Sequence, residues 1–139
     1  MKRMPPSPIK SIPGLLHHLS VSRLIDPFSI INRYNGTDWK EFTVMNPMSL
    51  FRNDYLELMI MNWKKGQNDV YYNNYSTVHT KVLDGSFNVA ETDWKTWVSN
   101  QVILSKGSVY TCQPFSKVLF IAKEKSTTLQ LYYYNNQLY

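Results

Sequence analysis

Hydrophobic positions along the chain follow two spacings, one before and one after about residue 47. In the first part, Leu15, Leu16 and Leu19 recur at the i, i+1, i+4 spacing of one helical face. In the second part, apolar and polar residues alternate over short runs separated by Gly, Asn and Asp turn signals, which predicts strands. The predicted strands cover residues 49–53, 55–63, 70–82, 86–91, 101–104, 107–111, 118–122 and 129–134. The pattern therefore predicts a mainly β protein, with N-terminal helices leading into an antiparallel β-barrel or jelly roll.

Local signals set the ends of the predicted helices. Three helices are expected, over residues 11–25, 26–34 and 38–42. Asn35-Gly36 is expected to close the second helix in a left-handed conformation. Thr37 is expected to cap the third.

The length of 139 residues suits a single domain. Residues 1–13 are basic and contain four prolines, so they are predicted to form an extended arm. Residues 14–139 are predicted to form the domain, with a helical part over about 14–46 and a barrel over about 47–134.

The formal net charge of +5 comes from lysines and arginines that are spread along the chain. This favours an ordinary solvated surface; nucleic acid is compatible with the charge but not specifically indicated. The longest apolar run, residues 55–63, is too short to span a membrane. Cys112 is the single cysteine, so an intrachain disulfide is excluded and a reducing, cytoplasmic location is expected. The N-terminal 25 residues contain basic but no acidic residues, which keeps a mitochondrial location open.

The histidines do not form a recognisable metal site. His17 and His18 are neighbours on a predicted helix and diverge by about 100°, so they cannot share a metal ion. His79 is expected to have a structural or surface role, because it alternates with an inward-facing neighbour on its strand. Cys112 is expected to be a small buried side chain.

Residues 66–85 resemble the first metal-binding motif of cupin barrels, including the spacing from the second histidine position to Gly85. The two histidine positions of that motif fall on Tyr71 and Asn73, and its glutamate position falls on Val78. The second cupin motif resembles the stretch from Gly107 through Pro114. Its histidine position falls on Leu119 or Phe120, and no histidine follows His79 in the chain.

Within the cupins, residues 14–134 resemble a cysteine dioxygenase. The matching segments, in order, are Thr37-Asp38-Trp39, Arg52-Asn53, Leu58-Met59-Ile60-Met61-Asn62-Trp63, Lys81-Val82-Leu83-Asp84-Gly85 and Leu129-Gln130-Leu131-Tyr132. The resemblance implies a cupin-type jelly roll. It also implies an ancestral reaction in which Fe(II), held by three histidines, adds O₂ to the sulfur of cysteine.

All three iron-ligand positions of that family are substituted here, by Tyr71, Asn73 and Leu119 or Phe120. These side chains are poor or impossible ligands for Fe(II). Val78 replaces the cysteine that crosslinks to the C-terminal tyrosine in the family, and Gln130 replaces a nearby histidine. We therefore expect a catalytically inactive relative that needs no metal or cofactor.

Two family groups persist. Arg52 matches the arginine that holds the substrate carboxylate, and Tyr132 matches the tyrosine beside the iron. Arg52 is expected either to keep an anion pocket or to pair with Asp54, Glu57 or another acid and stabilise the fold. The favoured hypothesis is a structural or protein-interaction subunit of a larger assembly, with protein subunits as partners. The alternative is a metal-free module that binds a small carboxylate or thiol at Arg52, Tyr132, Gln130 and Val78.

Overall fold

The computed structural model describes residues 7–21, 27–72, 76–93, 99–112 and 116–134. The helical elements are α1 (Ile12–Val21), α2 (Pro27–Arg33) and the 3₁₀ helix η1 (Asp38–Phe42). The strands are β1 (Met48–Arg52), β2 (Leu56–Trp63), β3 (Asn68–Tyr72), β4 (Ser76–Asp84), β5 (Ser86–Asp93), β6 (Ser99–Ser105), β7 (Val109–Cys112), β8 (Ser116–Ala122) and β9 (Ser126–Tyr134). None of the helices in these ranges is long and apolar enough to cross a membrane.

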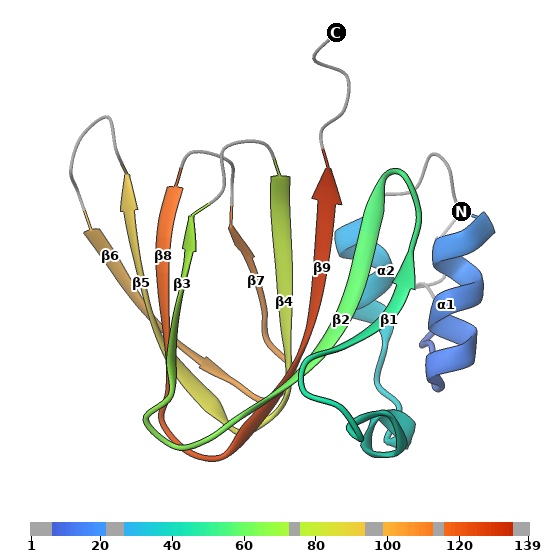
Figure 1. The fold of residues 1–139 in the computed structure, drawn as a ribbon, viewed down its shortest axis with the longest axis horizontal. Coiled ribbons are helices and arrows are strands. Elements are labelled where there is room, and N and C mark those ends of the chain that lie inside the picture. Colours follow the sequence, from blue (N-terminus) through green and yellow to red (C-terminus); the bar gives the residue numbers. More distant parts are fainter. Residues whose placement is uncertain (1–6, 22–26, 73–75, 94–98, 113–115, 135–139) are drawn as a thin grey trace, which may run out of the picture.

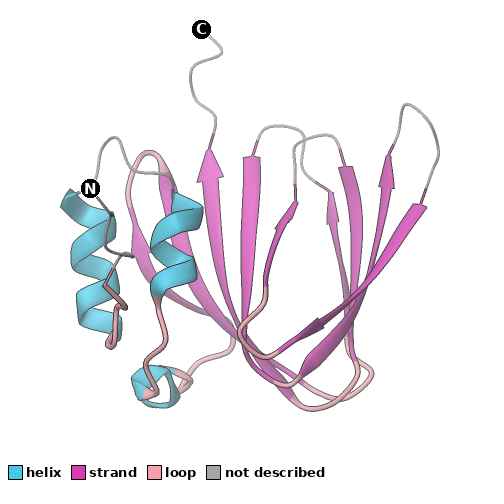
Figure 2. Cartoon of the chain, turned by 180° about the vertical axis from the view of Figure 1, so that it is seen from behind, coloured by secondary structure: helices cyan, strands magenta, loops and turns pink. Residues whose placement is uncertain are grey.

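The strands form two antiparallel sheets that face each other. One sheet has the order β1-β2-β9-β4-β7 and the other the order β3-β8-β5-β6. The helices lie on the side of the five-stranded sheet that faces away from the four-stranded sheet (Figures 1 and 2). The molecule therefore has a helical layer, a five-stranded sheet and a four-stranded sheet, with a core on each side of the middle layer.

The first core joins the helices to the five-stranded sheet. Strand β2 buries every second residue against the helices, including Leu58 and Ile60. The helices contribute Leu15 from α1 and Ile31 from α2 to the same cluster. Alternate residues of the strand and one face of each helix therefore pack together in a single apolar layer.

The second core fills the space between the two sheets. Trp63 lies edge-on to Phe87, with ring centroids 5.0 Å apart, and its Nε1 donates a hydrogen bond to Thr128 Oγ1 at 3.0 Å. Phe120 packs against both of these aromatic rings. Buried aromatic groups in edge-on contact of this kind are typical of a close-packed interior.

The sequence predicted most elements within a few residues of their observed ends. The single predicted run over 70–82 is divided between β3 and β4. The first helix begins at Ile12, so the last two residues of the predicted arm are helical. Residues 1–6 of that arm and 22–25 of the predicted first helix lie outside the described residues. Ile9 is buried, and its N–H donates to the Arg33 carbonyl at 2.9 Å.

Two predictions about helix ends are wrong. Thr37 makes no side-chain capping hydrogen bond to η1. Gly36 does not have a positive φ; instead, a Cβ at this position would overlap the carbonyl oxygen of Lys10. Glycine is therefore needed at position 36 because another backbone segment approaches closely.

Candidate functional site

The residues that resemble a remnant substrate pocket lie together on the inner face of the five-stranded sheet. Cross-strand pairing places Arg52 opposite Glu57, Glu57 opposite Tyr132, and Tyr132 opposite Val78. Directly opposite residues of an antiparallel pair share one sheet face. Arg52, Tyr132 and Val78 therefore lie in one row across four strands, although they are up to 80 positions apart in the sequence. We call this the inner-face row. Gln130 occupies the next row.

The residues of these two rows have different environments. Tyr132 is half-buried, and its hydroxyl donates to Gln130 Oε1 at 3.3 Å. Val78 and Gln130 are buried. Arg52 is exposed and, within the described part of the chain, forms no ion pair; the expected pairing with Asp54 or Glu57 is absent.

The burial pattern of β8 separates the two candidates for the third ligand position. Phe120 is 0% exposed and points between the sheets, where its ring centroid lies 5.8 Å from that of Tyr110. Leu119 points to the opposite face, in register with Ala90. Phe120 is therefore the residue at the interior position. Tyr71 pairs with Val118 in β3, but its side chain, like the whole of Asn73, lies outside what the structure describes.

Phe120, at the third iron-ligand position, does not fit the family's iron. Its side chain carries only carbon atoms, so it cannot donate an electron pair to a metal. Among residues with described side chains, no three or more of His, Cys, Asp and Glu are grouped so that they could hold a metal ion.

A polar bridge between the sheets was not foreseen from the sequence. Tyr110 on β7 donates a hydrogen bond from its hydroxyl to Glu91 Oε2 on β5, at 2.5 Å. Burial, together with this bond, raises the pKa of Tyr110 above its usual value. Cys112 is buried as predicted, and burial, with a smaller effect from Glu91, raises its pKa to about 12. The thiol is therefore protonated and poorly nucleophilic at neutral pH.

His79 and Lys81 connect β4 to the helical layer. His79 is buried, its Nδ1 lies 2.8 Å from Thr111 Oγ1, and its ring contacts that of Phe28 edge-on, which confirms a structural role. The Lys81 ammonium donates to the carbonyl oxygens of Asn32 at 2.9 Å and Tyr34 at 2.5 Å, at the end of α2. Burial lowers the pKa of Lys81. This lysine supplies a cation where the carbonyl groups of a helix end lack partners.

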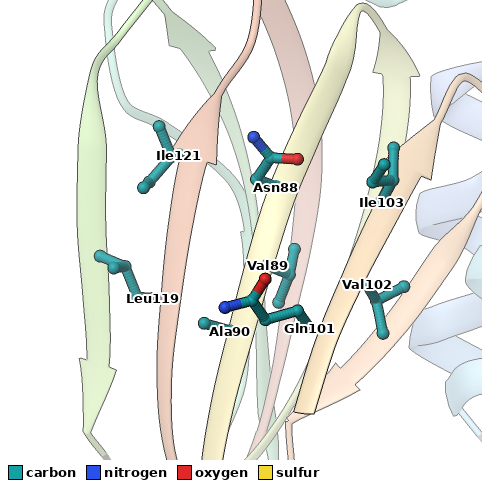
Figure 3. A pocket seen from close by; sticks show the side chains of 8 residues that line it. All are labelled: Asn88, Val89, Ala90, Gln101, Val102, Ile103, Leu119 and Ile121. Carbon is teal, nitrogen blue, oxygen red and sulfur yellow. The ribbon is translucent and has the colours of Figure 1, made fainter. Parts of the chain in front are cut away.

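The outer face of the four-stranded sheet is apolar and is not covered by any described element. Ile103 is 67% exposed and Val70 is 44% exposed. Val70 lies on β3 and Ile103 on β6. Between these two strands, Ala90, Leu119 and Ile121 are aligned by the cross-strand register and share a shallow hollow (Figure 3). We call these five residues the outer sheet face. The polar groups beside the hollow are the uncharged amides of Asn88 and Gln101, and the exposed Lys117 lies further along β8 on the same face of the sheet.

The fold is shared with known cupin structures. No protein-family model and no curated protein matches the chain. It is similar to the Cnp3 cupin domain of Schizosaccharomyces pombe, with 13% identity, a TM-score of 0.57, and coverage of 67% of this chain and 71% of that one. It is also similar to BH2720 of Bacillus halodurans, with 10% identity, a TM-score of 0.64, and coverage of 82% and 83%.

A third similar structure is the EutQ protein of Clostridium difficile, with 19% identity, a TM-score of 0.51, and coverage of 65% of this chain and 68% of that one. Identities this low show the fold alone. The chain has the cupin jelly-roll fold, which confirms the predicted fold class. The more specific resemblance to cysteine dioxygenases stays a prediction.

Proposed function

We propose that this chain is a non-catalytic cupin, descended from a cysteine dioxygenase, that serves as a structural or protein-binding subunit of a larger assembly. The observation that carries the proposal is Phe120, a fully buried aromatic residue at an interior position where the resembling family places an iron-binding histidine. Its ring packs against Trp63, Phe87 and Tyr110. Side chains that fill this space stabilise the barrel and leave little room for a metal with two substrates.

The outer sheet face supports a role in protein binding. Contiguous exposed apolar surface is costly in water and commonly marks a place where another protein binds. Here the apolar side chains come from β3, β5, β6 and β8, so they form a patch rather than isolated exposed residues. The partner expected at this face is a protein with its own apolar surface.

The first experiment isolates the tagged chain from its own cells under gentle conditions and identifies co-purifying subunits. The test variant is Val70→Gln with Ile103→Gln, and the matched control is Val44→Gln with Met45→Gln, which changes two exposed apolar residues off the sheet. We expect a fixed set of subunits with the wild type and the control, reduced at least fivefold with the sheet variant. A lone monomer in all three samples would contradict the proposal.

Truncation of the arm is a poor test of assembly. Ile9 and Ile12 are buried against the helical layer, so removal of residues 1–13 would also destabilise the domain.

The absence of catalysis that we propose has its own test. Oxygen uptake in the presence of Fe(II) and cysteine, above a no-protein control, would show that the chain is an enzyme.

One observation favours the second candidate, a small-carboxylate module. Arg52 is exposed on the inner-face row and forms no ion pair with a described residue, so its guanidinium could accept an anion. Glu57 stands directly opposite and would repel such a ligand. A thermal-shift series with cysteine and other amino acids tests whether Arg52 binds a carboxylate, because a ligand that binds only the folded protein must raise the midpoint of thermal unfolding. A rise that Arg52→Ala abolishes would favour this second candidate.

A further inference from the structure

A hollow rich in lysine lies at one end of the barrel, away from the inner-face row of Arg52. It is bordered by η1 and by the turns that follow β2, β4 and β8, which lie at the lower end of the molecule in Figure 1. Its volume is about 820 Å³. The charged residues around it are four lysines and one aspartate, namely Lys40, Lys64, Lys65, Lys125 and Asp84. We call this site the basic hollow.

The turn that carries two of these lysines is held firmly. Gly66 adopts a φ of +84°, and its N–H donates to the Ala122 carbonyl at 2.8 Å. The Lys64 N–H donates to Gln67 Oε1 at 3.0 Å, and the Gln67 N–H donates back to the Lys64 carbonyl at 2.9 Å. These bonds hold the backbone of Lys64 and Lys65 in one conformation. The turn therefore loses less conformational entropy when a ligand binds.

The four lysines of the basic hollow outnumber its one acidic residue, Asp84. Within the described residues, none of the four ammonium groups forms an ion pair. Asp84 accepts a hydrogen bond from the Gly85 N–H at 3.1 Å. A concave surface with several cations of one sign attracts polyanions and raises their local concentration.

An aromatic ring lies within this basic surface. Trp39 is half-buried and borders the basic hollow, and Lys40 Nζ lies 5.7 Å from its ring centroid. Trp39 and Lys40 also border a second hollow of about 270 Å³, which is lined by Lys106 as well. The basic surface therefore continues past the ring. Lys81 in the second hollow is already bound to two carbonyl oxygens and is not available for a ligand.

We propose that the basic hollow binds single-stranded nucleic acid, with its lysines on the phosphates and Trp39 against a base. A ring set among lysines suits a chain that alternates phosphates with planar bases. An acidic peptide would use the lysines but not the ring, and a duplex keeps its bases stacked on one another. This inference goes beyond the proposed function and does not depend on it.

Fluorescence anisotropy with the full chain and labelled 12-nucleotide oligo(dT) and oligo(U) tests the proposal. Each lysine contact with a single strand contributes a salt slope of about −0.7. The variant Lys65→Glu with Lys125→Glu should weaken binding at least tenfold and lower the magnitude of the salt slope by about 1.4. The matched control, Lys10→Glu with Lys117→Glu, makes the same change in net charge at exposed positions outside both hollows and should bind within about twofold of the wild type.

The role of the ring needs a separate readout. Trp39→Leu should weaken oligonucleotide binding by about tenfold or more and leave the weak binding of inorganic polyphosphate unchanged. Because Trp39 also packs against the helical core, the variant is used only if its thermal midpoint shows that it folds, and Trp39→Met, which also removes the aromatic ring, replaces it otherwise. Equal losses in the two lysine double variants, binding of a duplex as tight as that of the single strand, or no effect of changing Trp39 would each overturn the proposal.

Discussion

Replacing Phe120 by alanine tests whether the barrel interior is a packed core. Phe120 is fully buried, and its ring lies 6.1 Å from that of Phe87 and 5.8 Å from that of Tyr110. Loss of a buried phenylalanine costs about 3–5 kcal/mol, because the apolar contacts are removed and a cavity is left. Leu119 is the matched control: it is the adjacent residue on the opposite, outer face, and Leu119→Ala should cost about 1 kcal/mol.

Urea unfolding, followed by tryptophan fluorescence and far-UV circular dichroism, measures both free energies. A small domain has only about 5–15 kcal/mol of stability, so Phe120→Leu, expected to cost about 1 kcal/mol, is included in case the alanine variant does not fold. The expected result is a loss for Phe120→Ala that exceeds the loss for Leu119→Ala by at least about 2 kcal/mol. Equal losses below about 1 kcal/mol would mean that Phe120 borders an open cavity, and the argument for a filled interior would fail.

Three further predictions concern Lys81, Cys112 and Gly85. Lys81→Met should lower the free energy of unfolding by about 2–4 kcal/mol, because two carbonyl groups at the end of α2 lose a charged donor. Urea titration measures this loss. The control, Lys117→Met, should stay within about 0.5 kcal/mol of the wild type. The folded-state pKa of Cys112 is raised to about 12, so its stabilising effect is complete below the unfolded value of 9.0 and is lost as pH rises towards 12. Cys112→Ala should therefore make the alkaline fall in stability shallower by up to about 1.4 kcal/mol per pH unit, and an unchanged slope would refute this assignment. Gly85→Ala should cost more than Gly66→Ala, by about 1 kcal/mol or more, because both glycines have positive φ but only a Cβ at position 85 would overlap Ser126.

The sequence predicted the fold well where local periodicity decides the structure. Strand alternation located β2 and β8, and the stretch 81–85 predicted the turn at Gly85. The row from Arg52 to Tyr132 was recovered through resemblance to a family, because strand order brings β1, β2 and β9 together. Local pattern alone contains no information about that order.

Several features that the sequence did not predict depend on contacts between distant segments. Gly36 is required by Lys10, which lies 26 positions earlier, and not by a local left-handed turn. The bond from Tyr110 to Glu91 joins strands of different sheets, and Lys81 reaches the end of a helix 47 positions away. In each case the chemistry of one residue is determined by a partner that only the folded chain brings close.

The proposed functions rest on two separate surfaces. The outer sheet face is apolar and uncharged, whereas the basic hollow is cationic and lies at one end of the barrel. The two surfaces share no residue, so Val70→Gln with Ile103→Gln should leave oligonucleotide binding unchanged within about twofold. Lys65→Glu with Lys125→Glu should likewise keep the co-purifying subunits if these are held by protein contacts alone. Loss of the same subunits with both variants would instead mean that nucleic acid bridges the chain to its assembly, and treatment of the wild-type complex with nuclease would then release them.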